Sequence, residues 1–301
     1  MKLIFSDETI NDIDKKHIVD FITKKVEGFD LNLKDLEKIV LTKDYFEEVK
    51  LAWENIGKYN KGASNNSMGE GIGILISNKP LNPESKMVVL IGDSQWRNLL
   101  SENKKEFDFV IHVINHELAH AHDESIKHKN IYSEDMKRGY LSDLDFRSKY
   151  EADKFWSEYI AERLSSDTIT REFIDMIEKN TFNQLSQLSN FHSRNNHFLF
   201  RVWKTEDNFD EFNYYMEYVL KSFAHLLGIS HGLGKNHEWT VGINKKVRKW
   251  IGNSSLIEVW DSMSVNLSDL YDIYPDWDDF KELGELGKGV LQAWRCFGYF
   301  D

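Results

Sequence analysis

The sequence predicts an α+β protein whose first part holds a small sheet and whose remainder is mostly helical. Two β-like runs, at residues 71–77 and 87–91, lie in the first hundred residues. From about residue 107 onward, apolar residues recur at helical spacing, most clearly at 107–124, 146–164, 168–190, 210–227 and 276–296. Strands gathered before helices are typical of the α+β class.

The elements of the first hundred residues follow from local patterns. Residues 14–27 place apolar side chains on one face at helical spacing, and residues 39–42 read as a short strand that enters a second helix. A polar loop over residues 58–66 precedes the two β-like runs, which Pro80 and Pro83 separate. The apolar positions that indicate the two helices are Ile18, Val19, Ile22, Val26, Phe46, Val49 and Trp53.

Glycines at 69, 71 and 73 open the first β-like run. They lack the spacing of a dinucleotide-binding loop and precede a strand rather than a helix, so a nucleotide site is not expected there. Glycine at such a position permits the close approach of another backbone near a sheet edge. We therefore interpret this segment as the entrance to a strand at the edge of the sheet.

Composition restricts the partners and the compartment. The chain has 301 residues, 41% of them hydrophobic, and a net charge of −12 spread along its length. Such a surface repels nucleic acid and anionic membranes, so neither is an expected partner. No apolar run approaches the roughly 18 residues of a membrane span. The lone Cys296 and an N-terminus that turns acidic by Asp7 favour a cytoplasmic protein.

Residues 107–123 form the segment that indicates chemistry. Apolar residues at 110, 113, 114, 118 and 121 predict a buried amphipathic helix. On another stripe, His116 and His120 are four residues apart, so their imidazoles can converge on one metal ion. Glu117 is turned by about 100° around the helix, where its carboxylate can reach a water bound to the metal. The spacing predicts hydrolysis by a Zn²⁺-activated water with Glu117 as general base.

The segment His116-Glu117-Leu118-Ala119-His120 resembles the active-site helix of the zincin metallopeptidases. The metzincin branch would require glycine and histidine where this chain has Asp123 and Ile126. The resemblance therefore implies the gluzincin type, with a carboxylate from a later helix as third ligand. It covers roughly residues 37–165 and implies that a peptide substrate pairs with the edge strand at residues 71–76.

Two glutamates compete for the role of third ligand. Glu158 and Glu162 are similar to the gluzincin E-x-x-A-[DE] helix, which implies that Glu158 binds zinc and that Glu162 accepts a ring N–H of a zinc-bound histidine. Glu151, in Glu-Ala-Asp, resembles the ligand signature of small intracellular zincins. Glu158 is favoured because only it has a carboxylate one turn further on.

Other histidines have weaker assignments. His112 is one turn before His116 and is more consistent with the core or the surface than with metal support. His122 and Asp123 form the pair that marks a helical family of metal-dependent phosphohydrolases, which is an alternative function. A residue that stabilises the oxyanion is also expected, and His231, in a glycine-rich segment, is preferred. The other candidates for this role are Tyr214, Tyr215, His225 and His237.

These inferences predict a zincin-like metallopeptidase domain at residues 1–165 and a mainly helical part at 166–301 that completes the cleft or confers specificity. The expected partner is a peptide or protein substrate, and the oligomeric state stays open. A non-catalytic binding or regulatory protein on the same scaffold is the alternative of a different class. Glu117 favours the enzyme, because a purely structural zinc has no need of a carboxylate beside its ligand.

Overall fold

A computed structural model describes residues 2–58, 65–66, 69–78, 84–130, 144–196, 206–277 and 279–300. The chain divides into two compact units. The N-terminal unit comprises Met1–Lys137 and Asp167–Phe173, and the C-terminal unit comprises Arg138–Ser166 and Ile174–Asp301. Among the described residues, no helix combines the length and the apolarity needed to cross a membrane.

The N-terminal unit is built on a mixed four-stranded sheet with the order β1-β2-β6-β5. Strands β1, β2 and β6 run parallel, and β5 is antiparallel to β6 and pairs on one side only among the described strands. A separate antiparallel pair is formed by β3 and β4. The strands are β1 (Lys2–Phe5), β2 (Leu36–Thr42), β3 (Asn65–Asn66), β4 (Gly69–Glu70), β5 (Gly73–Ser77) and β6 (Met87–Gly92).

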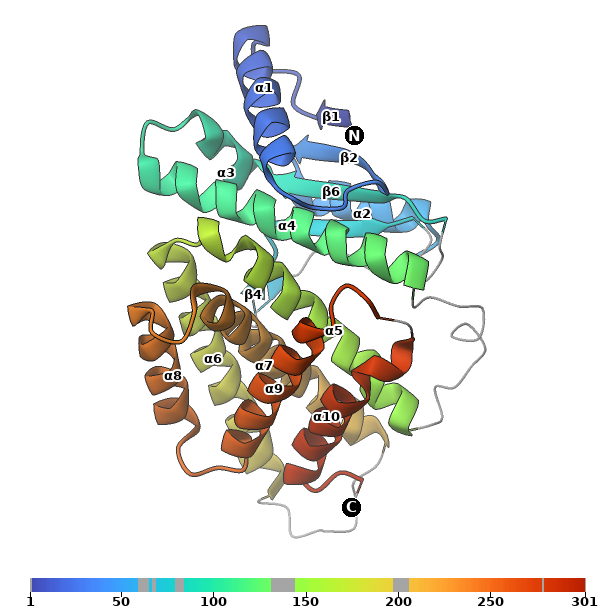
Figure 1. Ribbon diagram of the computed structural model, residues 1–301, viewed down its shortest axis with the longest axis vertical. Helices are drawn as coiled ribbons and strands as arrows, with labels where there is room; N and C mark the ends of the chain where they lie inside the picture. Colours follow the sequence, from blue (N-terminus) through green and yellow to red (C-terminus); the bar gives the residue numbers. More distant parts are fainter. Residues whose placement is uncertain are drawn as a thin grey trace. The chain divides into compact units, whose positions relative to one another are not determined.

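Helices cover both faces of this sheet (Figure 1). Helix α2 packs on the face that presents Val40, Leu90 and Ile76. Helix α4 lies on the opposite face, against Gly73 at the start of β5. The helices of this unit are α1 (Asp12–Gly28), α2 (Tyr45–Asn55), α3 (Asp93–Trp96) and α4 (Lys104–Asn130).

Helix α4 forms as its apolar period predicts. Val110, Val113, Ile114, Leu118 and Ala121 are all buried, so one continuous stripe of the helix faces the core. Before the first turn, the Asn103 side-chain amide and the Ser101 hydroxyl donate to the Glu106 carboxylate. The burial of this stripe fixes the rotation of the helix about its axis, and with it the direction of the histidine stripe.

The C-terminal unit is helical in all its described elements. Its core contains the fully buried Trp156, Trp260, Trp277 and Trp294. Trp156 of α5 packs on Trp277 with ring centroids 4.6 Å apart. The helices are α5 (Leu144–Ser165), α6 (Arg171–Asn196), α7 (Glu206–Leu233), α8 (Glu238–Ile251), α9 (Leu256–Asp272) and α10 (Gly284–Cys296).

The predicted α+β class is confirmed, and the two β-like runs correspond to β5 and β6. Strand β1 and helices α8 and α9 were not predicted as separate elements. The sequence interpretation placed the domain division after residue 165, whereas the compact units group α5 with the later helices. Most of the predicted polar loop at 58–66 lies outside the described residues, apart from residue 58 and β3.

Candidate metal centre

His116 and His120 converge on the same side of α4. Their Nε2 atoms are 3.0 Å apart, and the rings meet edge to face with centroids 4.6 Å apart. His116 is buried and His120 is half-buried. The i,i+4 spacing therefore brings the two Nε2 atoms close together, where their lone pairs can bind a common cation.

Glu117 is buried and its carboxyl group lies against the edge strand. A Cβ added to Gly73 would be 2.8 Å from Glu117 Oε1 and 3.0 Å from its Cγ, so any side chain at this position would displace the Glu117 carboxylate from where it lies. Ordinary contact at such a Cβ begins at 3.4 Å. The first residue of β5 thus accommodates the carboxylate that the sequence assigned to general-base catalysis.

A second glycine, on the neighbouring strand, accommodates Tyr45. A Cβ on Gly92 would be 3.3 Å from Tyr45 Cβ, and the Gly92 N–H donates to the Ile72 carbonyl, just before Gly73. The Tyr45 hydroxyl is buried and has no hydrogen-bond partner among the described residues. Burial, and then the charge of Glu117, raise the pKa of this hydroxyl. Tyr45 is a site neighbour that sequence patterns did not indicate.

Three other residues of α4, His112, His122 and Asp123, have partners within the N-terminal unit. His112 is fully buried, its Nδ1 is 3.2 Å from the Thr168 hydroxyl, and its ring packs edge-on against Phe173. His122 Nδ1 accepts the Asn32 N–H at 2.6 Å, and burial lowers the pKa of that imidazole.

Asp123 forms a buried ion pair with Lys127 at 2.7 Å. The pair His122 and Asp123, predicted as an alternative metal motif, is therefore engaged with a backbone amide and an ammonium group.

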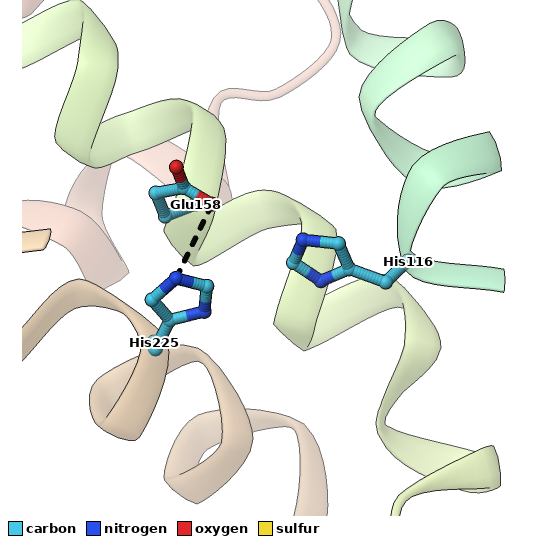
Figure 2. A group of neighbouring side chains, drawn as sticks. All are labelled: His116, Glu158 and His225. Atoms are coloured by element: carbon cyan, nitrogen blue, oxygen red, sulfur yellow. Dashed lines mark ion pairs between the residues drawn. The ribbon is translucent and has the colours of Figure 1, made fainter. Parts of the chain in front are cut away.

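In the C-terminal unit, Glu158 and Glu162 of α5 both contact His225 of α7. His225 Nδ1 is 2.8 Å from Glu162 Oε1, and its Nε2 is 3.3 Å from Glu158 Oε2 (Figure 2). Glu162 is fully buried, and Glu158 and His225 are half-buried. Glu162 therefore contacts His225, which the sequence analysis did not place among the zinc ligands, and its predicted bond to a zinc-bound histidine stays a prediction. Figure 2 also draws His116, which belongs to the N-terminal unit.

Glu151, the rival of Glu158, lies in a different environment. Its carboxylate accepts a hydrogen bond from Lys154 Nζ at 2.8 Å, and Lys154 also contacts Glu217 at 2.9 Å. Burial raises the pKa of Glu151, and Lys154 opposes this effect. A carboxylate neutralised by an ammonium group is less available to a cation than one facing an imidazole.

Two glycines let α7 approach α5 closely. A Cβ on Gly228 would be 2.5 Å from the Tyr159 carbonyl oxygen and 2.8 Å from Glu162 Cβ. One turn later, a Cβ on Gly232 would meet the Ser166 side chain first and would be 2.9 Å from the Arg163 carbonyl oxygen. We call these two positions the glycine seam. It fixes the distance between the backbones that carry Glu162 and His225.

His231, predicted to stabilise an oxyanion, has a partner at each ring nitrogen. Its Nδ1 is 2.9 Å from the Tyr159 hydroxyl and its Nε2 is 3.2 Å from the Ser264 hydroxyl. Arg163 donates to the same Tyr159 hydroxyl. Burial, followed by the charges of Arg163 and Lys235, lowers the pKa of His231 to about 4. These contacts hold a neutral imidazole, and its catalytic role stays a prediction.

Sequence reasoning gave less weight to His225, which was one of five candidates for the oxyanion role. Its contacts with α5 span more than sixty residues of sequence, so no local spacing marks them. The only signal in the sequence for this contact was the pair of carboxylates at 158 and 162, because two neighbouring carboxylates require a positively charged group or a metal ion as partner. Gly73 was noted as a glycine near an edge, although its contact with Glu117 was not foreseen.

Comparison with known proteins gives no match: no protein-family model, curated protein or solved structure matches the chain.

Proposed function

We propose that the protein is a zinc-dependent peptidase in which His116, His120 and Glu158 hold the metal and Glu117 is the general base. The observation that carries this proposal is that the Nε2 atoms of His116 and His120 converge on one side of α4. The carboxylate of Glu117, on the same helix, lies against the edge strand β5. The zincin resemblance of residues 116–120 supports the same chemistry.

The geometry of the two histidines fits a shared zinc ion. Two nitrogens bound at about 2.0–2.1 Å with a tetrahedral angle are about 3.3 Å apart. The observed separation of 3.0 Å is close to this value. A direct hydrogen bond between the rings is the competing explanation, and it requires one Nε2 to donate and the other to accept.

The environment of each glutamate supports Glu158 over Glu151 as the third ligand. Glu158 faces an imidazole and interacts with the charge of Lys221, whereas the Glu151 carboxylate accepts a direct hydrogen bond from Lys154. Its neighbour Glu162 is fully buried and bound to a histidine, which is the kind of outer carboxylate that orients a metal ligand.

Zinc, when bound, would polarise the scissile carbonyl and lower the pKa of a coordinated water towards about 7. Glu117 would accept a proton from the attacking water and deliver it to the leaving amine. Strand β5 would bind the substrate, because its outer side has unpaired backbone groups among the described strands and an extended peptide can add to such an edge. Gly73 would then position Glu117 next to the added peptide.

The test is the pair Glu117→Gln and Glu124→Gln, assayed on a library of peptides with cleavage read by mass spectrometry. The amide of Glu117→Gln keeps the shape of the side chain and cannot take a proton, so hydrolysis should fall by about 10²–10⁴ while zinc content is unchanged. Glu124, two turns along the same helix, is the matched control and should retain activity.

Two outcomes would contradict the proposal. Equal cleavage by Glu117→Gln and the wild type would remove Glu117 from the chemistry. A cellular effect of the wild type that survives in zinc-loaded Glu117→Gln would favour the non-catalytic binding protein instead.

A further inference from the structure

The C-terminal unit brings together one imidazole and two carboxylates, which are side chains of the kind that bind metal ions. His225 is placed between two carboxylates of one helix, with Glu162 at its Nδ1 and Glu158 at its Nε2. Glu158 and His225 are among the residues whose donor atoms could hold a metal ion. The three come from two helices held together by the glycine seam.

The fully buried Glu162 determines which nitrogen of His225 faces Glu158. A buried carboxylate requires a donor, and the Nδ1–H of His225 supplies it at 2.8 Å. The Nε2 atom is then the one presented to Glu158, at 3.3 Å. A carboxylate that accepts the N–H of one ring nitrogen, while the other nitrogen faces a second ligand, is the arrangement of metal-binding histidines.

His225 Nε2 and the Glu158 carboxylate are together suited to bind a cation. In the tautomer with hydrogen on Nδ1, Nε2 carries a lone pair, and the facing carboxylate oxygen is also an acceptor. Two acceptors 3.3 Å apart repel each other unless a cation or a proton lies between them. The same separation is about that of two ligands on a tetrahedral zinc ion.

We propose that His225 is a metal ligand alongside Glu158, oriented by the hydrogen bond from its Nδ1–H to Glu162. This inference rests on the proposed zinc peptidase and adds a third imidazole to its ligand set.

Packing at the glycine seam supports the placement of His225 between the two carboxylates. At position 228 any side chain would meet the Tyr159 carbonyl oxygen and Glu162 Cβ, so α7 lies closer to α5 than a residue larger than glycine would allow. Position 228 is three residues after His225, on the neighbouring part of the same helix face. This close approach brings the short imidazole of His225 within reach of both carboxylates.

The test compares zinc affinity of the full chain in His225→Gln, Glu162→Gln and His237→Asn, by competition with a chelator. The amide of His225→Gln can still donate a hydrogen bond to Glu162 or Glu158, so a mere hydrogen-bonding role would be preserved while the imidazole ligand is lost. We expect zinc affinity to fall more than about a hundredfold in His225→Gln, beyond the 10–100-fold typical of outer contacts, and by about 10–100-fold in Glu162→Gln. His237→Asn keeps a helix-capping residue at the start of α8 and should bind zinc normally.

A measurement on the wild type avoids any folding defect of the variants. X-ray absorption of the zinc-loaded protein should count three imidazole ligands, and a count of two would overturn the proposal. So would a loss of zinc affinity of less than about a hundredfold in His225→Gln, because such a loss is typical of an outer contact.

The outcomes also separate this inference from the proposed function. If His116→Ala abolishes zinc binding and His225→Gln does not, His225 is no ligand and the peptidase proposal stands. If His225→Gln abolishes zinc binding and His116→Ala does not, the metal belongs to the C-terminal unit and the peptidase proposal fails.

Discussion

Adding one methyl group at Gly73 should slow catalysis without removing the metal. The Cβ of Gly73→Ala would be 2.8 Å from Glu117 Oε1, and ordinary contact begins at 3.4 Å, so the carboxylate has to retreat by about 0.6 Å. A displacement of about 1 Å in a catalytic group can cost a hundredfold in rate. We therefore expect kcat to fall by about tenfold to a hundredfold.

The stability of Gly73→Ala should change little, for two opposing reasons. Overpacking typically costs about 1–3 kcal/mol, but here the closest atom is the far end of a flexible side chain that can rotate away. Replacing glycine by alanine also restricts the unfolded chain, which contributes about 0.4–1 kcal/mol in favour of folding. The free energy of unfolding should stay within about 1 kcal/mol of the wild type. Zinc content should be unchanged, because the added methyl group meets Glu117 and not a ligand.

The assay measures kcat on a peptide that the wild type cleaves, zinc per chain and urea unfolding in the same preparations. Gly28→Ala is the control, because a Cβ there meets nothing within 4 Å. Wild-type kcat in Gly73→Ala, with zinc intact, would refute the assignment of the Glu117 carboxylate over β5 as the working base.

Three further predictions follow from the contacts of single side chains. Removing the buried hydroxyl in Tyr45→Phe should raise the free energy of unfolding by about 1 kcal/mol in urea, because that hydroxyl has no partner among the described residues; a loss of stability would reveal one. Glu158→Ala should lower zinc affinity by more than about a hundredfold, as expected of a direct ligand, and Glu151→Ala should not, measured by chelator competition; the reverse order would make Glu151 the ligand. The His231 pKa of about 4 lies below the usual 6.5, so the unfolded chain binds the extra proton first and stability falls as the pH drops from 6.5 towards 4. In His231→Asn this fall, followed by thermal unfolding, should be shallower, and an unchanged slope would show that His231 does not contribute.

The elements nearest the proposed chemistry were the most predictable, because their signals are local. The buried stripe of α4 repeats at helical spacing, and the same repeat orients His116 and His120. Strand β5 has a glycine entrance and a continuous apolar run, and the structure places it at an edge of the sheet. Helix α4 and strand β5 could therefore be predicted from hydrophobic periodicity and the positions of glycines alone.

The contacts that sequence reasoning did not foresee depend on residues far apart in the chain. His225 meets Glu162 only because α7 packs on α5, and the charge of Glu117 acts on Tyr45, a residue far from it in the sequence. Strand β1 is four residues long and half-exposed, so its apolar pattern is too short to separate from a loop. The grouping of α5 with the later helices likewise follows from packing against α7 and α10, which no local pattern encodes.

The glycine seam limits which mutations a lineage carrying this chain can accumulate. Gly228 and Gly232 each differ from alanine by one methyl group, and a single nucleotide change converts a glycine codon to an alanine codon. At Gly228 that change would push α7 away from α5, because the nearest obstructing atom is the Tyr159 carbonyl oxygen, which cannot rotate aside. At Gly232 the nearest obstructing atoms belong to the Ser166 side chain, and the Arg163 carbonyl oxygen lies next to them. Helix formation itself favours alanine by about 1 kcal/mol at each position. Persistence of glycine at both positions in related chains would therefore record selection for the spacing of the two helices, against the intrinsic preference of the helix.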